Sequence, residues 1–478
     1  MTALHALSTA ELLDLYERRA ASPVEVTEAV LAHIARWEPH LQATYALDPE
    51  GALEQARASE ARWLRGEPQG ALDGVTVTLK ENIATRGVPM PLGTAATELA
   101  PAADDAPPAA RLREAGAVLL GKTTMPDYGM LSSGLSSFHA LTRNPWDLTL
   151  NPGGSSAGAA AAAAAGYGPL HVGTDIGGSV RLPAAWCGIF TLKPSLGRIP
   201  IHPPFAGRVA GPMTRSVEDA ARLMAVLSQP DVRDTMSLPP QAIDWARLER
   251  PVRGLRIGLQ MDAGWGLPVE AETAAAVEAA AHAFAAAGAS VEAVPPFMTR
   301  AMIDGLDDFW RMRAWLDISA LPAARRARVL PYIVEWARGA AGLSGERVFR
   351  GYSQMAAMRD AAVQACAPFD VVLSPTAPVA AFAAELPSPT NDPARPFEHI
   401  AFTLPYNMSE QPAASINAGY TAAGLPIGLQ IVGARHDDLG VLQVARAWEL
   451  MRPAPRPWPQ PPEPVASASA SVSTSAGT

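Results

Sequence analysis

Residues 151–183 read NPGGSSAGAAAAAAAGYGPLHVGTDIGGSVRLP, and this stretch decides how the rest of the chain is arranged. Two glycine pairs run directly into serine, at Gly153-Gly154-Ser155-Ser156 and at Gly177-Gly178-Ser179. The alanine run between them, 159–165, favours a helix. Glycine before serine permits a tight turn and lets a ligand approach main-chain N–H groups. Two such loops flanking one helix predict a site where serine hydroxyls and backbone donors converge.

The composition of the whole chain narrows the class of protein. Its 478 residues suit one large α/β domain, and 48% apolar residues suffice for a sizeable core. A formal net charge of −9 leaves no basic surplus to neutralise phosphates, so we expect no nucleic-acid partner. No apolar stretch reaches membrane-spanning length, and the first residues do not resemble a signal peptide. The chain is therefore expected to be cytoplasmic, without membrane contact.

Cysteine and histidine give no sign of a metal site. Cys187 and Cys366 provide neither a disulfide framework nor zinc spacing, and the nine histidines form no HExxH-like cluster. We expect no metal and no cofactor. Cys187 is interpreted as a buried small residue, and His171 as a packed or hydrogen-bonded group.

Apolar patterning predicts strands that alternate with helices. Serine caps, with Glu11 three residues after Ser8 and Pro23 after Ser22, indicate helices near the N-terminus. The segments with helical character are 7–37, 52–64, 111–115, 159–165, 271–287, 309–359 and 439–450. The β-rich runs are 74–79, 117–120, 170–172, 256–259, 371–373 and 425–432. This alternation predicts an α/β fold whose mixed or parallel sheet has helices on both faces.

These elements are assigned to one large domain, residues 1–452. It consists of an N-terminal helical layer at 1–70, a core at 74–200 around the quoted stretch, and the segments that follow. Residues 453–464 are proline-rich, and 465–478 are almost only Ala, Ser, Val and Thr. Such a tail cannot bury enough apolar surface to offset its ordering entropy, so 453–478 is predicted to be disordered.

A serine hydroxyl is inert as a nucleophile until a base removes its proton. Neither glycine–serine loop contains histidine, whereas Lys80 ends a β-rich run and precedes Glu81-Asn82. A lysine with its usual pKa of about 10.4 is almost fully protonated near neutral pH. Burial at the end of a strand would lower that pKa and make Lys80 a competent base.

At this point the chain resembles the amidase signature family of serine hydrolases. The resemblance rests on Lys80 in TLKEN, Ser155 in GGSSAG and Ser179 in DIGGSVR. Three further segments, KTTMPDYG, FDVVLSPTAP and GLPIGLQIVG, are also similar to the family, and the likeness covers residues 7–453. It implies the amidase signature fold, a single large domain with a central mixed sheet flanked by helices.

The resemblance also implies the role of each site residue. Ser179 would be the nucleophile, and Ser155, with a cis peptide bond, would relay its proton to Lys80. The N–H groups of Ile176, Gly177, Gly178 and Ser179 would form the oxyanion hole. Asp175 and Arg181 would brace the loop from behind. The chain departs from the commoner family pattern at Ala157 and Tyr128.

The substrate pocket is predicted from loops and helices expected over the catalytic face. Its candidate residues are Tyr128, Met130, His202, Phe205, Phe309 and Trp310. The loop 199–208, with Pro203-Pro204, is interpreted as a lid. Because the set is apolar and aromatic, with no evident partner for a carboxylate, it favours a neutral, bulky or aryl amide, or a carbamate.

Other functions remain open from the sequence. The family also includes the glutamine-hydrolysing subunit of a tRNA-dependent amidotransferase, which needs a protein partner. A non-catalytic binding protein with this fold is a further alternative. A phosphate-binding loop is disfavoured, because GxxxxGK[ST] is absent. We expect a small amide or carbamate as the partner molecule and a monomer or homodimer.

Overall fold

Strands from the whole length of the chain join in one sheet in the computed structural model, which describes residues 3–463. The strands are β1 (Thr44–Tyr45), β2 (Thr76–Lys80), β3 (Val118–Thr123), β4 (Leu170–Asp175), β5 (Phe190–Lys193), β6 (Val209–Thr214), β7 (Arg256–Leu259), β8 (Ser290–Ala293), β9 (Val371–Pro375), β10 (Ala413–Tyr420) and β11 (Pro426–Gly433). Across the sheet their order is β1-β3-β2-β4-β6-β5-β10-β11-β9-β7-β8.

The sheet is mixed, as predicted. Strand β2 runs parallel to both of its neighbours, β3 and β4, and β7 runs parallel to β8 and β9. The remaining pairs are antiparallel. Parallel neighbours end at the same edge of a sheet, so Lys80 at the end of β2 and Asp175 at the end of β4 lie at one edge.

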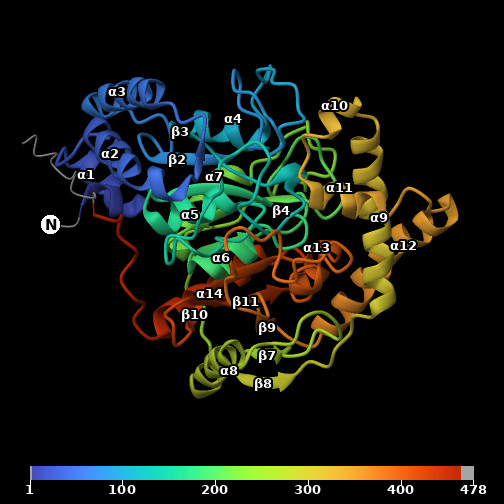
Figure 1. Ribbon diagram of the computed structural model, residues 1–478. Helices are drawn as coiled ribbons and strands as arrows, with labels where there is room; N and C mark the ends of the chain where they lie inside the picture. Colours follow the sequence, from blue (N-terminus) through green and yellow to red (C-terminus); the bar gives the residue numbers. More distant parts are fainter. Residues whose placement is uncertain (1–2, 464–478) are drawn as a thin grey trace, which may run out of the picture.

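Helices cover both faces of the sheet (Figure 1). The α-helices are α1 (Thr9–Glu17), α2 (Pro23–Leu41), α3 (Pro49–Arg65), α4 (Pro107–Glu114), α5 (Ala157–Ala165), α6 (Arg181–Cys187), α7 (Val217–Leu227), α8 (Ala271–Ala286), α9 (Arg300–Ser319), α10 (Ala323–Arg326), α11 (Pro331–Arg338), α12 (Gly345–Cys366), α13 (Pro405–Met408) and α14 (Asp438–Met451). Short 3-10 helices are η1 (Leu4–Ala6), η2 (Asp127–Gly129) and η3 (Glu398–Ile400). Helices α5 and α6 contact each other on one face. On the other face, α14 contacts both α7 and α8.

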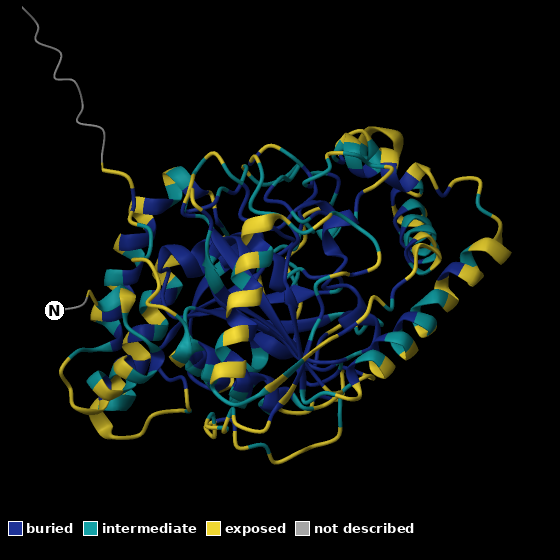
Figure 2. Cartoon of the chain, turned by 90° about the horizontal axis from the view of Figure 1, so that it is seen from below, coloured by how far each residue is buried: buried dark blue, intermediate teal, exposed yellow. Residues whose placement is uncertain are grey.

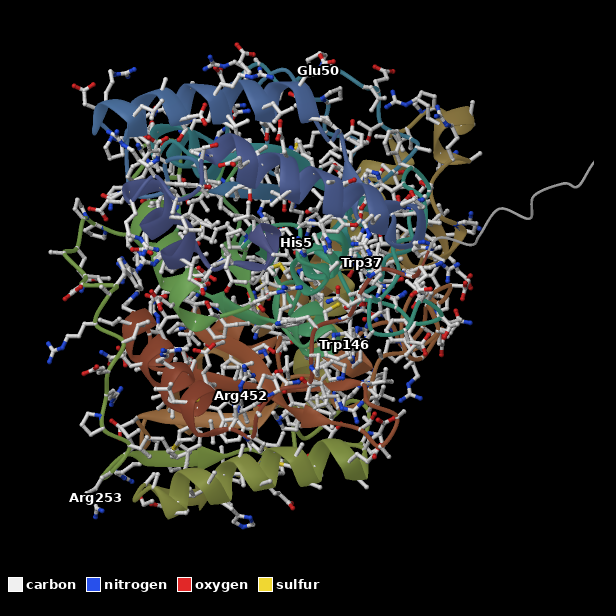
Figure 3. All side chains as sticks on the ribbon, turned by 90° about the vertical axis from the view of Figure 1, so that its left-hand side faces the viewer. His5, Trp37, Glu50, Trp146, Arg253 and Arg452 are labelled. Carbon is white, nitrogen blue, oxygen red and sulfur yellow. The ribbon has the colours of Figure 1, made fainter. Side chains whose placement is uncertain are left out.

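The N-terminal helices begin where the sequence predicts. The side chain of Ser8 accepts from the backbone of Glu11, and Ser22 does the same for Glu25, so both helices start with a capping box. Figure 3 shows these blue helices at one end of the molecule and α8, near Arg253, at the opposite end. Figure 2 shows the interior between them as buried, with exposed residues on outer helix faces and loops.

Helix α5 is buried over its whole length, which is unusual for a helix of nine residues. Each of its residues, from Ala157 to Ala165, is at most 1% exposed apart from Gly158, which is also buried. A Cβ on Gly158 would lie 2.2 Å from Ala43 O and 2.4 Å from Thr124 N. Only small residues let the backbones approach so closely, which explains the alanine run.

Two predictions about elements differ from the structure. The segment 309–359 is not one helix, because α9, α10, α11 and α12 are separated at Pro322, Pro331 and Gly339 to Gly342, where proline and glycine interrupt helices. Five strands, β1, β5, β6, β8 and β10, are absent from the predicted set. They carry proline, glycine or polar residues that obscure a strand pattern.

The C-terminal segment from Pro453 lies against the body as far as the structure describes it. The Trp458 ring packs near Trp146, with ring centroids 6.1 Å apart, and the Arg215 guanidinium lies 4.5 Å from its centroid. The structure therefore differs from the predicted disordered tail in residues 453–463, because one tryptophan supplies the apolar contact that the composition does not suggest. The rest of that predicted tail, 464–478, lies outside the described residues.

Within residues 3–463, no helix is both long enough and apolar enough to cross a membrane.

Candidate active site

Lys80 stands at the centre of a cluster of hydroxyl groups. Its Nζ donates to Ser155 Oγ at 2.8 Å, to Thr174 Oγ1 at 3.0 Å and to Ser156 Oγ at 3.1 Å. The three hydroxyls come from the loop before α5 and from the end of β4, and parallel β2 brings Lys80 to the same edge. The peptide bond between Gly154 and Ser155 is cis, as the resemblance implies.

The environment of Lys80 favours a neutral amine. The side chain is completely buried, and this burial lowers the pKa of Lys80 to about 7, although the charges of Asp175 and Glu81 act in the opposite direction. A lysine with this pKa exchanges a proton near neutral pH, which a proton relay requires. The depressed pKa expected from the sequence therefore has a physical cause in the fold.

The second glycine–serine loop is held by a buried ion pair. The Asp175 carboxylate accepts from Arg181 Nε at 3.1 Å and from Arg181 Nη2 at 3.0 Å, and both side chains are inaccessible to solvent. Burial alone would raise the pKa of Asp175, but the charge and hydrogen bonds of Arg181 outweigh it and hold the pKa below its usual range. A permanently ionised carboxylate is thus fixed directly before Ile176.

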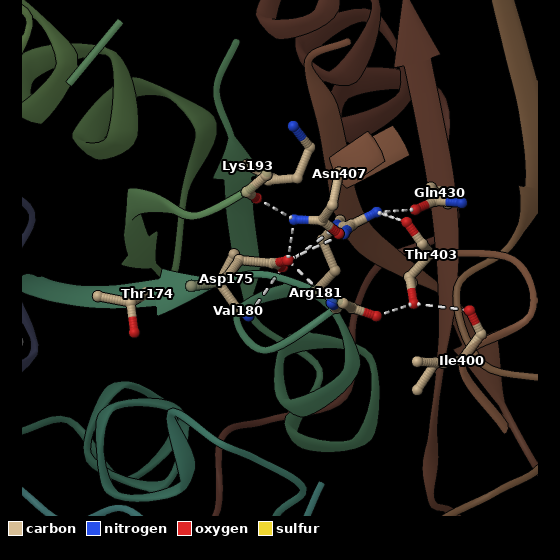
Figure 4. A network of polar contacts seen from close by, with 12 residues as sticks. Thr174, Asp175, Val180, Arg181, Lys193, Ile400, Thr403, Asn407 and Gln430 are labelled. Atoms are coloured by element: carbon tan, nitrogen blue, oxygen red, sulfur yellow. Dashed lines mark hydrogen bonds and ion pairs between the residues drawn. The ribbon is translucent and has the colours of Figure 1, made fainter. Parts of the chain in front are cut away.

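The C-terminal part of the chain completes this pair (Figure 4). Arg181 Nη1 donates to Thr403 O at 2.8 Å and to Gln430 Oε1 at 2.9 Å, and Nη2 donates to Asn407 Oδ1 at 2.5 Å. Asn407 Nδ2 in turn donates to Asp175 Oδ1 at 2.9 Å. The loop that carries Ser179 is therefore positioned by residues more than 200 positions later in the sequence.

The backbone donors near Ser179 are divided between two tasks. The N–H of Gly178 donates to Asp175 Oδ1 at 2.8 Å, and the N–H of Val180 donates to Asp175 Oδ2 at 3.1 Å. The predicted inclusion of Gly178 in the oxyanion hole is therefore wrong for this conformation, because Asp175 already occupies its donor. Ile176, Gly177 and Ser179 have no acceptor for their N–H groups among residues 3–463 and stay predicted donors.

Ser179 opens onto a small cavity of about 40 Å³. Its walls are Gly129, Met130, Leu131, Ser132, Ile176, Gly177, Trp310, Arg313, Phe397 and Ile400, together with Ser179. Ser156 N donates to Ser179 O at 3.1 Å, which places the backbone of Ser179 beside the Ser155-Ser156 loop. The cavity, the serine and the buried lysine thus occupy one neighbourhood.

Only part of the predicted substrate pocket lies around this cavity. Met130 and Trp310 line it. Phe205 does not, but its ring lies under the guanidinium of Arg313, with Cζ 4.6 Å from the ring centroid, so the predicted lid loop touches the cavity wall.

Three predicted pocket residues do not line the cavity. His202 is exposed, and its Nδ1 lies 3.3 Å from Arg233 O on the outer side of the loop. Phe309 precedes Trp310 by one residue, so it points to another side of α9 and packs edge-on against Tyr352 at 5.1 Å. Tyr128 packs against the apolar cluster that contains Leu131, Trp310 and Ile400, but it is not itself a lining residue, whereas its neighbours 129–132 are.

Sequence reasoning missed several residues of the site. Thr174 and Ser156 hold Lys80, and Arg313, Phe397 and Ile400 form part of the cavity wall. A signal for Arg313 exists, because it follows Trp310 by three positions and therefore shares its face of a helix. Phe397 and Ile400 belong to the short 3-10 helix η3 and the residue before it, a segment too short for a periodic pattern, so the sequence gives no such signal.

His171 and Cys187, the remaining residues considered in the sequence, lie in the interior of the protein. His171 Nδ1 lies 2.8 Å from Thr78 Oγ1, and burial lowers the pKa of His171 to about 3. Cys187 is fully buried. In the part of the chain that the structure describes, no three His, Cys, Asp or Glu side chains gather in a way that could hold a metal ion.

Comparison with known proteins identifies similar chains over nearly the whole length. A family model described as Amidase matches residues 25–442. A glutamyl-tRNA(Gln) amidotransferase subunit from Myxococcus xanthus (strain DK1622) is 35% identical over 482 aligned residues, which cover 93% of this chain and 97% of that protein.

Solved structures are also similar to this chain over nearly its whole length. A bacterial aryl acylamidase of the amidase signature family is similar with a TM-score of 0.86 and 31% identity, over 94% of this chain and 96% of that chain. The 6-aminohexanoate cyclic dimer hydrolase is similar with a TM-score of 0.82 and 28% identity, over 95% and 99% of the two chains.

Proposed function

Because the chain belongs to the amidase signature family, we propose that it hydrolyses the C–N bond of an amide or carbamate through an acyl-enzyme on Ser179. The observation that carries the proposal is the 2.8 Å hydrogen bond between buried Lys80 Nζ and Ser155 Oγ, next to the cavity that Ser179 lines. A base with a pKa near 7, a bridging hydroxyl and an accessible serine are the groups that acyl transfer needs.

In the proposed mechanism, Ser179 Oγ attacks the carbonyl carbon while its proton passes through Ser155 to Lys80 Nζ. The N–H groups of Ile176, Gly177 and Ser179 donate to the oxyanion of the tetrahedral intermediate. When the intermediate collapses, the proton returns through Ser155 to the leaving nitrogen, and the amine departs. Water then attacks the acyl-enzyme with the help of the same relay and restores Ser179.

The walls of the cavity favour a substrate with an apolar body. Trp310, Phe397, Ile400, Met130 and Leu131 offer aromatic and aliphatic surface. We propose an aryl or otherwise bulky acylamide, or a carbamate, which the 31% identical aryl acylamidase supports. The cavity of about 40 Å³ is smaller than the roughly 150 Å³ in which a protein can hold benzene. We therefore propose that such a substrate widens the cavity, and that the contact between Phe205 and Arg313 is the place where it opens.

A second candidate is the glutamine-hydrolysing subunit of a tRNA-dependent amidotransferase. It is favoured by the 35% identity to the glutamyl-tRNA(Gln) amidotransferase subunit from Myxococcus xanthus. This candidate predicts weak activity of the isolated chain on anilides and dependence on a protein partner, whereas the first predicts activity of the chain alone.

Turnover by the isolated chain decides between these candidates. We expect hydrolysis of a panel of acetanilides or aryl carbamates, with glutamine a poor substrate. Ser179→Ala should lose both hydrolysis and labelling by a fluorophosphonate probe, because both require its Oγ. Labelling that persists in Ser179→Ala and disappears in Ser156→Ala would assign the nucleophile to the other loop. Intact hydrolysis in Ser179→Ala would contradict the mechanism.

A further inference from the structure

Arg313 brings a positive charge without a protein partner to the wall of the Ser179 cavity. The residue lies on α9, three positions after Trp310, and both side chains line the cavity. The guanidinium stacks on the Phe205 ring at 4.6 Å. It has neither an ion pair nor a hydrogen bond to any residue between 3 and 463. Arg313 is half-buried, so its donors are only partly available to bulk water.

Three other arginines, in the interior or on the same helix, have acceptors. Arg181 is bound by a carboxylate, two side-chain amides and a carbonyl. Arg198 Nε donates to Asp438 Oδ2 at 2.9 Å. Arg311, two residues before Arg313 on the same helix, pairs with Asp307 at 2.7 Å and donates to two carbonyls. The Arg313 guanidinium, by contrast, lines the cavity with no protein acceptor, so an acidic group of a ligand in the cavity could pair with it.

The charges around the cavity favour an anion. Arg208, on the lid loop, is half-buried and lies close enough for the charge of Arg313 to lower its pKa in addition to burial. The charge of Arg208 in turn contributes to the low pKa of Lys80. Of the nearby carboxylates, Asp317 lies exposed one turn further along α9, and Asp175 is already paired with Arg181.

Trp310 supplies a second donor on the same face of α9. Its side chain is 5% exposed, and its buried Nε1 has no hydrogen-bond partner within the described chain. The ring lies against the catalytic loop, because a Cβ on Gly177 would be 3.4 Å from Trp310 Cη2. One planar guanidinium with several N–H groups and one indole N–H suit a carboxylate, which accepts several hydrogen bonds in one plane.

We propose that the cavity recognises an amide that carries a carboxylate away from the scissile bond, with Arg313 as the group that pairs with it. The inference rests on the proposed amide hydrolysis at Ser179, and it replaces the neutral substrate expected from the sequence. Arg313 is a specificity residue in this scheme, because it contacts the substrate but takes no part in proton transfer.

Two matched substrate pairs test the proposal. N-succinyl-4-nitroanilide and N-butyryl-4-nitroanilide differ by a carboxylate on the acyl side, and 4-acetamidobenzoate and 4-acetamidotoluene differ by one on the amine side. For one of these pairs we expect kcat/KM to favour the acidic member at least about 10-fold. Arg313→Gln should reduce that preference about 10–100-fold, the range for a hydrogen-bonded charge.

Two control variants separate recognition from folding. Arg313→Lys keeps the charge but loses the planar fork, so it should retain part of the preference. Arg350→Gln removes an exposed arginine of α12, which pairs with Glu346 one turn away, and should leave the preference unchanged. Unfolding temperatures of all three variants show whether a loss reflects the fold.

Binding provides a readout that does not depend on turnover. In calorimetry with Ser179→Ala, the acidic member of one pair should bind at least about 10-fold more tightly than the neutral member, and the added Arg313→Gln should remove the difference. Equal kcat/KM and equal binding within both pairs, or a preference that survives Arg313→Gln, would overturn the proposal. Failure of the amide hydrolysis itself would instead appear as activity that survives Ser179→Ala, whatever the residue at 313.

Discussion

At the scale of single residues, the burial of Lys80 predicts the pH range of the proposed reaction. Below about pH 7 the amine is protonated and cannot accept the proton of Ser155, and above that pH it is neutral and can. We therefore expect kcat/KM to rise with pH through about 7, since this parameter reports the pKa of the free enzyme. A histidine base would give a limb at a similar pH, so the profile must be compared with that of a Lys80 variant.

Lys80→Ala should lose about 10²–10⁴-fold in kcat/KM on an anilide and should lose the acid limb. The loss should be smaller on an activated ester, because its leaving group needs no proton. The measurement is kcat/KM against pH for both substrates. An acid limb that remains in Lys80→Ala, or equal losses on the two substrates, would remove Lys80 from the relay.

The buried pair of Asp175 and Arg181 is the other residue-scale determinant. Asp175→Asn would leave the Arg181 guanidinium buried without a counter-charge and would weaken the acceptor of the Gly178 and Val180 N–H groups. We expect a loss of about 3–5 kcal/mol in the free energy of unfolding. Glu218→Gln, which breaks the exposed pair with Arg222 on α7, should cost at most about 1 kcal/mol. Similar denaturant midpoints for the two variants would contradict this account.

At the scale of elements, helix α5 should tolerate no growth of its side chains. Ala162 is completely buried between the sheet and neighbouring helices, whereas Ala279 on α8 is exposed. Ala162→Leu should destabilise the protein by about 1–3 kcal/mol because the packed interior cannot accept the added atoms. Ala279→Leu, the same change on another alanine-rich helix, should stay within about 0.5 kcal/mol. Urea unfolding of the two variants measures the difference in their free energies of unfolding. Equal midpoints would show that the packing around α5 can accept a larger side chain.

The same elements show how far the sequence predicts the fold. The caps at Ser8 and Ser22, the strand ending at Lys80 and the helix at 159–165 were predictable, because each depends on neighbours within a few residues. The breaks between α9 and α12 also have a local cause, because prolines and glycines interrupt the helical pattern there. Strand β6 was not predictable in the same way, because its segment VAGPMT acquires its extended form from pairing with β4 and β5.

The candidate site, like the fold, is only partly predictable from the sequence. Lys80, Ser155 and Ser179 sit in motifs, so their residue types predict their proximity. Three other features depend on how distant segments pack. Asp175 accepts from the N–H of Gly178, His202 is exposed, and Arg313 lines the cavity. No periodicity within one segment contains that information.

At the scale of the whole molecule, the segment after α14 contacts Arg215, a residue that is hydrogen-bonded to the end of α5. The Trp458 ring lies between Arg215 and Trp146, and Arg215 also donates to the carbonyls of Ala163 and Ala164 at the end of α5. Trp458→Ala should lower the free energy of unfolding by about 1–2 kcal/mol, since it removes a cation–π contact and an aromatic pair.

Pro455→Ala, a change at an exposed position of the same segment, is the matched control. Its thermal midpoint should remain that of the parent protein, whereas that of Trp458→Ala should fall. A midpoint unaffected by Trp458→Ala would show that the contact contributes nothing to the stability of the body.

The acceptors of Arg181 also determine when the molecule can become active during its synthesis. Lys80, Ser155, Asp175 and Ser179 leave the ribosome early, but the carbonyl of Thr403 and the amides of Asn407 and Gln430 emerge much later. Before they emerge, Arg181 has its counter-charge in Asp175 but lacks three of its hydrogen-bond acceptors, so the pair that holds the Ser179 loop cannot reach its fully hydrogen-bonded, buried form. We therefore expect that a growing polypeptide holds Lys80, Ser155 and Ser179 before their loop is fully supported, and that the proposed hydrolysis begins only once translation has passed β11.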